Sequence, residues 1–319
     1  MLTVADLPKP GSTPFTSSLA TARSTRTPLT PAAALVEPPR FDSSDREFLY
    51  READFERVRS LIYKRAGISL SPVKHDMVYS RLARRLRAKS LKTFKEYLDR
   101  LESGVDPSEW EAFVNALTTN LTSFFREAHH FDILADFMRG LERRPIKIWC
   151  SAASTGEEPY SLAITACEVF GSMTPPVQII ASDLDTNVLA QGERGVYAEE
   201  RIERMDRTRV QKFFLRGTGT QDGFVRVRPE LQRLISFRRV NLLDRQWPLQ
   251  GPFDAMFCRN VMIYFDKPTQ YDILERFLPL LREDGLLFAG HSENFIHAAK
   301  LFRSLGRTVY ARASTGTRA

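Results

Sequence analysis

Two adjacent carboxylates, Glu157 and Glu158, lie where many nucleotide-binding proteins place a phosphate. Their stretch, SAASTGEEPYSLAI, indicates the end of a strand, a turn on Gly156 and a helix that begins at Pro159. A helix N-terminus presents free N–H groups and a partial positive charge, so an anion is its usual ligand. A pyrophosphate at this turn would meet two like charges. The stretch therefore favours a cationic ligand, unless both glutamates only stabilise the helix dipole.

S-adenosylmethionine (SAM) suits a site beside these two glutamates, because it carries a sulfonium and an ammonium group and no phosphate. Its ribose still needs an anchor, and an acidic residue at the end of the second strand usually supplies one. Asp183, in the stretch ASDLD, follows Gly156 by about 27 residues, near the spacing expected for that role. No G-x-G-x-x-G motif is present. These residues predict a SAM-type cleft rather than a dinucleotide site.

Strands and helices alternate after Pro145, and this order indicates the fold that holds the acidic residues. Helices are expected from Pro159, after the Gly156 turn, to about Phe170 and over 267–284, the second ended by Gly285. Buried apolar runs predict strands at 146–152, 177–185, 234–244, 253–260 and 285–290, with a further strand within 300–312. The alternation predicts an α/β fold with a doubly wound, mainly parallel sheet.

Three further regions differ in composition from this α/β domain. Residues 1–40 are rich in Thr, Ser, Pro and Ala without periodic apolar positions, which predicts a disordered tail. Residues 41–127 predict an N-terminal helical domain, whose first helix has Asp54 as a candidate N-cap and ends at Gly67. The α/β domain then covers 128–319, and a Gly-rich stretch at about 212–232 predicts a small antiparallel β-subdomain inserted into it.

The bulk properties exclude some classes of protein. No apolar run approaches the ~18 residues of a membrane helix, and the first residues lack a signal-peptide pattern, so we expect a cytoplasmic protein without membrane insertion. The three cysteines are far apart, which indicates reduced thiols rather than disulfides or a zinc motif. We interpret Cys258 as a small buried residue and not a nucleophile. His129, His130 and His291 have no ligand spacing, so no metal site is expected.

The positive charge of the chain is concentrated in one segment. The net charge is +7, and residues 45–100 carry 15 Lys/Arg against 8 Asp/Glu, an excess equal to that of the whole chain. In the helix MVYSRLARRLR, three arginines lie roughly opposite the apolar side and Arg85 lies at the border; the three are Arg81, Arg84 and Arg87. This face is either simply solvated or a docking surface for an acidic partner.

Several longer motifs, in order along the chain, resemble one family. They are TTNLTSFFREAHHF, SAASTGEEPYS, ASDLDTNVL, VNLLD, FCRNVMIYFD and GLLFAGHSENF. Over roughly 48–311 the chain is similar to the chemotaxis receptor glutamate O-methyltransferases (CheR). The resemblance implies a class I SAM-dependent methyltransferase fold. It also implies methyl transfer from SAM to glutamate side chains on the cytoplasmic helices of chemoreceptors, giving glutamyl methyl esters and S-adenosylhomocysteine (SAH) in chemotactic adaptation.

The resemblance also implies which residues form the site. The residues expected to bind the cofactor are Asn120, Thr122, Arg126, Gly156, Glu157, Glu158, Asp183, Asn241, Leu242, Arg259 and Asn260. Among these, Asp183 would hold the ribose hydroxyls, Asn241 and Leu242 would flank the adenine, and either glutamate could touch the cofactor. Arg126 and Tyr264 would lie near the transferring methyl group as the catalytic residues.

Two partner surfaces follow from the same resemblance. The helical domain would contact receptor helices through Arg81, Arg84, Arg85 and Arg87. In family members that dock on a receptor's C-terminal pentapeptide, the β-subdomain adds the peptide as an edge strand. By this resemblance Gly217, Gly219, Gly223 and Arg226 would contact the peptide, although the Gly-rich stretch is also compatible with a merely flexible hairpin.

Two other functions remain as alternatives. An RNA or DNA methyltransferase would also combine this cofactor with a basic helical domain. Against it, the chain has no DPPY or NPPY motif and no Pro-Cys pair, and aromatic residues are not interleaved with the basic helix. We therefore expect no nucleic-acid partner. A non-catalytic scaffold that keeps the cofactor fold is the second alternative, and the complete set of motifs disfavours it.

Overall fold

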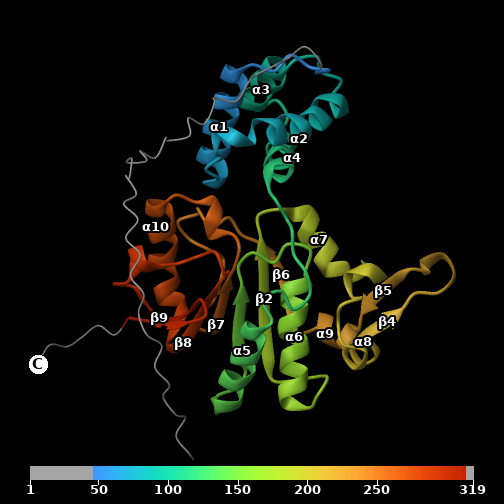
Figure 1. Cartoon of the computed structure of the whole chain (residues 1–319), viewed down its shortest axis with the longest axis vertical. Helices are drawn as coiled ribbons and strands as arrows, with labels where there is room; N and C mark the ends of the chain where they lie inside the picture. The colour runs from blue at the N-terminus through green and yellow to red at the C-terminus, as the bar shows by residue number, and fades with distance from the viewer. Residues whose placement is uncertain (1–45, 314–319) are drawn as a thin grey trace, which may run out of the picture. The chain divides into compact units, whose positions relative to one another are not determined.

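The protein is described by a computed structural model that covers residues 46–313. The predicted tail, 1–40, lies outside the described residues. The described chain has a helical part followed by an α/β part with a small antiparallel sheet (Figure 1). The predicted α/β fold class, with its N-terminal helical domain and its β-subdomain, is confirmed.

The helical part packs short amphipathic helices around one apolar core. Its elements are α1 (Glu52–Ala66), η1 (Pro72–Lys74), α2 (His75–Ala88), α3 (Phe94–Ser103) and α4 (Pro107–Leu117). The prediction of Asp54 as N-cap is wrong: the N-cap is Arg51, three residues earlier, and the Asp54 carboxylate at the third helical position accepts a hydrogen bond from the N–H of Arg51. The predicted end at Gly67 is confirmed, since this residue has a left-handed φ of 67°.

The α/β part is built on a seven-stranded sheet in the order β6-β2-β1-β7-β8-β10-β9. The strands are β1 (Ile146–Cys150), β2 (Val177–Asp183), β6 (Ile235–Arg239), β7 (Phe253–Cys258), β8 (Leu281–Ala289), β9 (Phe302–Gly306) and β10 (Val309–Arg312). The strands from β6 to β8 run parallel, whereas β10 pairs antiparallel with β8 and β9. The strand order reverses between β1 and β7, and ligands of such sheets bind outside the carboxyl ends at that point.

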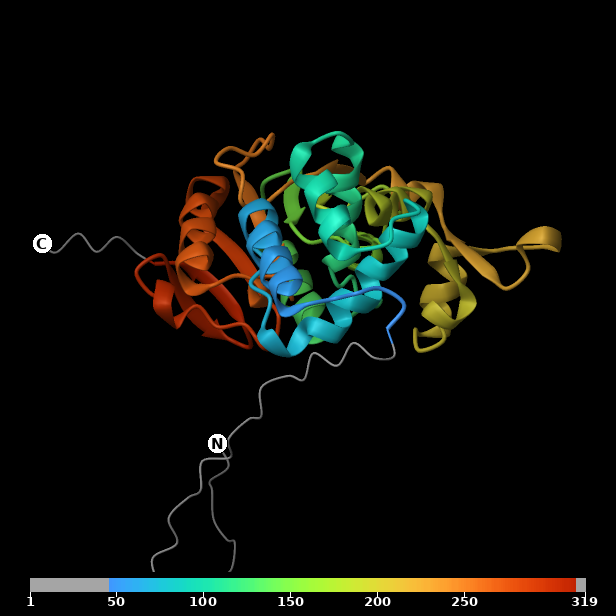
Figure 2. The ribbon, with the colours of Figure 1, turned by 90° about the horizontal axis from the view of Figure 1, so that it is seen from above.

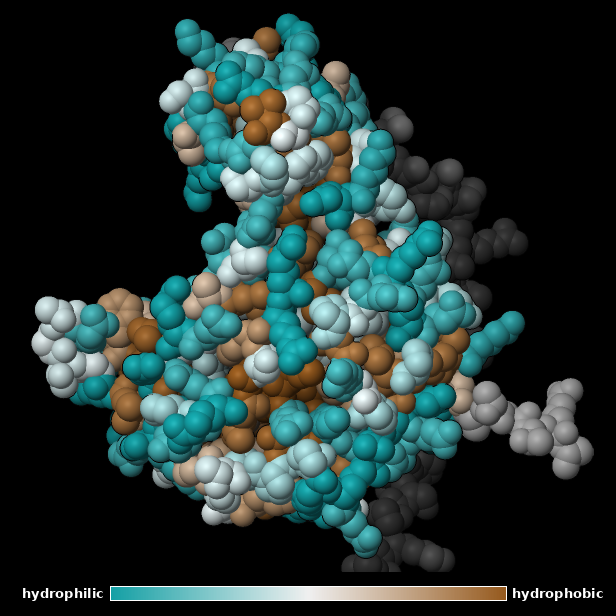
Figure 3. All heavy atoms as spheres, turned by 180° about the vertical axis from the view of Figure 1, so that it is seen from behind, coloured by the Kyte–Doolittle hydropathy of each residue, from teal (hydrophilic) through white to brown (hydrophobic). Residues whose placement is uncertain are grey.

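Helices cover the sheet and complete its core. The four longest are α5 (His129–Gly140), α6 (Glu157–Phe170), α7 (Thr186–Arg194) and α10 (Lys267–Phe277). In Figure 1, α5 and α6 lie side by side in front of the sheet. The surface of the molecule seen from behind carries hydrophobic residues in its middle, with hydrophilic residues around them (Figure 3). None of the helices within residues 46–313 combines the length and apolar character needed to span a lipid bilayer.

One predicted helix is shorter than expected. The segment 267–284 was expected to be helical throughout, but α10 ends at Phe277 and β8 begins at Leu281. Pro279 lies in the short turn η5 (Leu278–Leu280) between them and cannot donate to a continuing helix. Leu281 then pairs with Phe253 of β7, so the residues from Leu281 onward belong to strand β8 and not to the helix.

The small antiparallel sheet lies between β2 and β6 in the chain and has the strand order β3-β5-β4. Its elements are β3 (Val196–Ala198), η2 (Glu199–Arg201), α8 (Arg207–Phe213), β4 (Phe214–Arg216), η3 (Gly219–Gln221), β5 (Phe224–Val227) and α9 (Pro229–Gln232). The sheet thus begins before the Gly-rich stretch at 212–232, because β3 supplies one of its edges. The hairpin of β4 and β5 extends away from the main sheet (Figure 2).

Candidate active site

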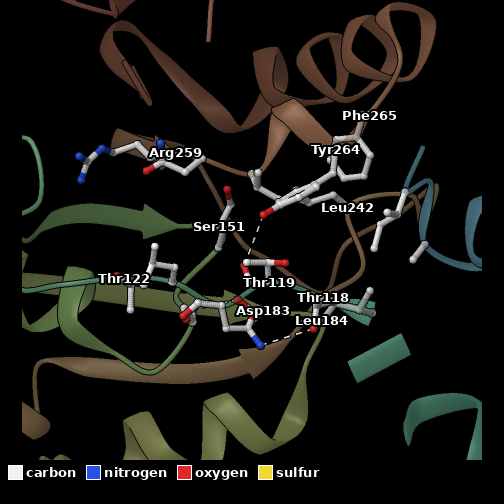
Figure 4. Close-up of a pocket in the computed structure, with 18 of the residues that line it drawn as sticks. Thr118, Thr119, Thr122, Ser151, Asp183, Leu184, Leu242, Arg259, Tyr264 and Phe265 are labelled. Atoms are coloured by element: carbon white, nitrogen blue, oxygen red, sulfur yellow. Dashed lines mark hydrogen bonds between the residues drawn. The ribbon is translucent and has the colours of Figure 1, made fainter. Parts of the chain in front are cut away.

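A cleft of about 920 Å³, open mouth included, lies at the carboxyl ends of β1, β2, β6 and β7. Figure 4 shows side chains from these strand ends, from the linker after α4 and from η4 (Met262–Tyr264) facing one another around it. The predicted site residues that line it are Asn120, Thr122, Arg126, Glu158, Asp183, Asn241, Leu242, Arg259, Asn260 and Tyr264. The structure therefore brings most of the predicted cofactor and catalytic residues together.

The two adjacent glutamates have different surroundings. Glu158 lines the cleft, whereas Glu157 does not. Glu157 is fully buried and forms an ion pair with Arg201, and it accepts a hydrogen bond from the hydroxyl of Thr155 at 2.6 Å. Successive residues of a helix point about 100° apart, so only one of two neighbours at a helix start can face the same cleft. Glu158 is the glutamate placed to reach a ligand.

Gly156 shapes the turn without lining the cleft. Its φ is 99°, a left-handed value that side chains rarely adopt. A Cβ atom on Gly156 would lie 2.7 Å from the Tyr197 hydroxyl and 2.9 Å from the Cα atom of Gly192 in α7. The glycine is therefore required for the close approach of the turn to α7.

Glu158 is paired with a buried cation. Arg259 is 4% exposed, and its guanidinium contacts Glu158, Glu127 at 3.1 Å and the carbonyl oxygen of Arg126. Burial alone would raise the pKa of Glu127, but Arg259 and the N–H groups of His291 outweigh it and lower that pKa to about 2. The acidic mouth thus contains less unpaired negative charge than two free glutamates would give.

Of the two carboxylates that line the cleft, Glu158 is paired with Arg259, whereas Asp183 forms no ion pair with a residue of 46–313. One oxygen accepts the N–H of Ser154 at 2.8 Å, and the other accepts the N–H of Asp185 at 3.0 Å. Burial raises the pKa of Asp183, and these two N–H groups oppose the rise. Each oxygen keeps acceptor capacity, so the side chain at the end of β2 can receive hydroxyl groups of a ligand.

The linker after α4 carries both a cofactor residue and a candidate catalytic residue. The Asn120 amide donates to Asp185 at 3.0 Å. The Arg126 guanidinium donates to the carbonyl oxygen of Leu121 at 2.9 Å. The Tyr264 hydroxyl, in η4, is 3.4 Å from the carbonyl oxygen of Thr119 (Figure 4). Arg126 and Tyr264 are therefore both attached to the backbone of the same short segment.

The loops after β6 and β7 close the other side of the cleft. Asn241 donates to the carbonyl oxygen of Arg65 at the end of α1, at 3.3 Å. Asn260 has a left-handed φ of 58°, and its N–H donates to Glu293 at 2.9 Å. A Cβ on Gly290 would lie 2.3 Å from the Asn260 side-chain nitrogen, so a glycine at this position allows the close approach of the Asn260 loop to the end of β8.

Sequence reasoning missed a large part of the cleft. The missed lining residues are Ala66, Ile68, Leu117, Thr118, Thr119, Leu121, Ser151, Ala152, Ser154, Leu184, Val240, Val261 and Phe265. The serines and Ala152 belong to the quoted stretch SAASTG, where small residues after a strand were an available signal. Ala66, Ile68 and Leu117 come from the helical part, and in the sequence they are indistinguishable from ordinary core residues.

The arginines of α2 are mostly engaged within the chain. Arg81 donates to the carbonyl oxygens of Thr118 and Ala116, Arg85 makes two hydrogen bonds to Glu109, and Arg87 pairs with Glu47. Arg84 is exposed and makes no hydrogen bond or ion pair with any residue of 46–313. These residues do not line the cleft.

Of the residues assigned to a peptide site, Arg226 lies in strand β5, and the three glycines lie in the connection between β4 and β5. Gly219 and Gly223 have left-handed φ values of 62° and 80°, and neither has an atom within 4 Å of a Cβ position. Gly217 has no such room, because a Cβ there would lie 2.0 Å from the carbonyl oxygen of Gln221. Arg226 is exposed on the central strand β5, and β4 is an edge strand beside it.

The cysteines are inert in this fold. Cys150, Cys167 and Cys258 are free and buried, which confirms the interpretation of Cys258 as a small buried residue. Burial raises the pKa of the Cys258 thiol, and such a thiol is a poor nucleophile. The Cys150 thiol donates to Glu158 at 3.2 Å and so helps to orient that carboxylate.

Comparison with known proteins identifies the family that shares this architecture. A family model described as the SAM binding domain of CheR methyltransferase matches residues 120–311, and one described as its all-alpha domain matches residues 53–118. The chain belongs to the CheR methyltransferase family. The predicted family is thereby confirmed.

Curated relatives match this CheR chain along most of their length. It is 56% identical over 271 residues to chemotaxis protein methyltransferase 2 of Pseudomonas aeruginosa, across 84% of this chain and 96% of the relative. It is 53% identical over 260 residues to the chemotaxis protein methyltransferase of Escherichia coli, across 82% of this chain and 91% of the relative. The corresponding protein of Salmonella typhimurium is 54% identical over 260 residues, across 82% and 90%.

The cleft of this CheR protein suits SAM. Asp183 offers a carboxylate without a cationic partner among the described residues, as a pair of ribose hydroxyls requires. Leu184, Val240 and Leu242 add an apolar wall for a planar base. Arg259, the buried cation of the cleft, is already neutralised by Glu158 and Glu127 and is not free to bind a phosphate. The residues present therefore fit a positively charged nucleoside.

Proposed function

We propose that this protein transfers a methyl group from SAM to glutamate side chains on the cytoplasmic helices of chemoreceptors, giving methyl esters and SAH in chemotactic adaptation. The observation that carries the proposal is the attachment of Arg126 and Tyr264 to one linker segment beside Asp183 in a single cleft. The names of the relatives, chemotaxis protein methyltransferases, support the choice of pathway. With such an acceptor, the reaction would occur in the cytoplasm.

The chain's own residues would hold the cofactor in a defined orientation. When bound, SAM supplies a methyl group attached to a positively charged sulfur. Asp183 would accept its ribose hydroxyls, and Asn241 and Leu242 would flank its adenine. Glu158 would add a carboxylate to the cleft that is already paired with Arg259, so Asp183 would be the unpaired carboxylate among the described lining residues.

The acceptor needs no general base. A glutamate at neutral pH is already ionised, so its carboxylate can attack without losing a proton first. Arg126 and Tyr264 would orient this carboxylate and replace its water, and alignment of this kind can lower a barrier by several kcal/mol, on the order of effective-molarity estimates. Because the Arg126 guanidinium also donates to Leu121, it would hold the carboxylate without saturating it.

Docking of the acceptor would use the basic helical domain, 41–127. Arg84 is the arginine of α2 that is exposed and without a partner within residues 46–313, so we assign receptor contact to it first. Arg81, Arg85 and Arg87 would contribute mainly through the field of their charges, because each is bonded within the chain. A receptor pentapeptide would add to the edge strand β4, near Gly217, Gly219, Gly223 and Arg226.

The proposal is tested by incubation with labelled SAM and receptor cytoplasmic fragments, with and without the C-terminal pentapeptide. We expect base-labile methyl label on the receptor, and faster labelling when the pentapeptide is present. Label in added RNA or DNA instead would favour the alternative acceptor. Methylation without any effect of the pentapeptide would reject only the β-subdomain assignment.

The catalytic assignments are tested separately. Arg126→Ala and Tyr264→Phe should lower kcat for methyl transfer, and Tyr264→Phe should change the affinity for SAH much less than it changes kcat. Stopped assays of methyl ester formation give kcat, and calorimetry gives the affinity for SAH. Unchanged turnover in both variants would remove these two residues from the mechanism.

A further inference from the structure

Two exposed apolar side chains adjoin the candidate catalytic residues. Leu121, in the linker that carries Arg126, is 76% exposed, and Ile263, which precedes Tyr264 in η4, is 52% exposed. Single apolar residues are common on protein surfaces, so exposure alone indicates nothing. The informative feature is their position, because each belongs to a segment that also supplies a residue of the cleft mouth.

Both side chains are held on well-fixed backbone. The carbonyl oxygen of Leu121 accepts a hydrogen bond from Arg126 at 2.9 Å, and Leu121 is one of the residues that line the cleft. The N–H of Ile263 donates to the buried Glu293 at 3.3 Å. The Tyr264 hydroxyl contacts Thr119, two residues before Leu121, so the two segments meet at the cleft.

We infer that Leu121 and Ile263 form an apolar rim that seats one face of an acceptor helix around the glutamate to be methylated. The inference rests on the proposed function and adds the chemistry of acceptor recognition. A carboxylate that reaches Arg126 and Tyr264 must enter beside this rim. Apolar neighbours of that carboxylate would pack on the rim and exclude water from the reacting group.

The charge next to the rim agrees with a helical, acidic acceptor. Arg81 joins α2 to Thr118 and Thr119 of the same linker. Arg84 follows Arg81 by one turn, and residues at this spacing share a helix face. An apolar rim near Arg84, which has no partner within residues 46–313, fits a helix with apolar residues around a glutamate and further acids nearby. It offers little to a nucleic-acid backbone, which needs a row of cations.

The test replaces each rim residue by serine and measures acceptor kinetics with a receptor cytoplasmic fragment. Ile263→Ser and Leu121→Ser should each raise the acceptor KM about five- to tenfold, as loss of a partly buried aliphatic side chain implies. For Ile263→Ser, whose residue does not line the cofactor cleft, the affinity for SAH, measured by calorimetry, should stay within about twofold of wild type. Ile263→Leu and Leu121→Met keep the apolar volume and should restore the acceptor KM.

Val105 provides the matched control. It is 81% exposed, lies between α3 and α4 and does not line the cleft, so Val105→Ser should leave the acceptor KM unchanged. Unchanged acceptor KM in both rim variants would overturn the inference. A loss of SAH affinity in Ile263→Ser as large as the rise in its acceptor KM would also overturn it, because Ile263 would then act only by shaping the cofactor cleft. A wild-type protein that forms no methyl ester would instead reject the proposed function, and the rim with it.

Discussion

His130 is a fully buried histidine whose protonation state is determined by its neighbours. Its Nε2 atom lies 2.9 Å from the carbonyl oxygen of Arg307, which fixes Nε2–H as a donor when the ring is neutral. Burial and, to a smaller extent, the charge of Arg259 lower the pKa of His130 to about 4. The unfolded chain binds a proton at this residue near pH 6.5, well before the folded protein does.

This difference makes stability depend on pH. The contribution of His130 is complete above pH 6.5 and is lost as pH falls from there toward 4, because only the unfolded state gains the proton in that window. His130→Gln keeps a neutral donor for the carbonyl oxygen of Arg307 but cannot gain a proton. We therefore expect the free energy of unfolding of wild type, relative to that of the variant, to fall by about 2 kcal/mol between pH 7 and pH 5. Urea unfolding at several pH values measures this, and parallel curves for the two proteins would contradict it.

At the scale of elements, the end of α1 is one contact through which the helical part meets the cofactor cleft. Gly67 ends the helix, and a Cβ on it would lie 2.8 Å from Leu243 and 3.1 Å from Phe265, which lines the cleft. Two residues later, the N–H of Ser69 donates to the carbonyl oxygen of Tyr264 at 2.8 Å. The helix end is therefore packed directly behind a candidate catalytic residue.

Gly67→Ala should weaken both stability and SAH binding, because Leu243 and Phe265 would have to shift as well as the backbone. Gly104, the C-cap of α3, has nearly the same φ, 68°, and nothing within 4 Å of a Cβ position. Gly104→Ala should cost only the backbone strain, about 1–2 kcal/mol, without change in SAH affinity. Calorimetry measures the SAH affinities of the two variants. Equal affinities would show that the packing around Gly67 does not affect cofactor binding.

The elements were largely predictable, and the failures have physical causes. Buried apolar runs located the strands of the main sheet because parallel strands are covered on both faces. The helix over 267–284 was overextended because apolar runs do not distinguish the end of a helix from the start of a buried strand. There the pairing of Leu281 with Phe253 decided the outcome.

The site was predictable where a residue type had one clear role. Asp183 follows a strand at a known spacing, and the structure shows it without an ion pair within residues 46–313. The basic face of α2 was predicted from a helical wheel alone. Its bonds join residues far apart in sequence, such as Arg85 to Glu109 and Arg87 to Glu47, and no local pattern could reveal them.

At the scale of the whole molecule, the net charge of +7 creates a long-range attraction for acidic partners. That attraction is screened within about 10 Å at 0.1 M salt, so it affects association more than the bound state. Three arginines of α2 already neutralise acids or bind carbonyl groups within the chain. Among the arginines of α2, the exposed Arg84 is therefore the one at which a change of charge should affect stability least.

Arg84→Glu should lower kcat/KM for a receptor fragment about three- to tenfold near 0.02 M salt, and the difference should shrink near 0.5 M salt. Arg303→Glu makes the same charge change on β9, at the outer edge of the sheet, and should have little effect. Initial methylation rates at low acceptor concentration measure both. Equal rates for Arg84→Glu and wild type at low salt would exclude the docking role of α2.

The walls of the cleft come from widely separated parts of the chain: Ala66, Ser151 and Phe265 all face it. A nascent chain that has left the ribosome only as far as α6 has the acidic turn but lacks the opposite wall. Capture of SAM must therefore wait until translation has passed Phe265. Nucleoside binding by this protein would therefore report that the chain has been made through Phe265 and that the helical and α/β parts have assembled, and a product that stops before Phe265 should not bind the cofactor.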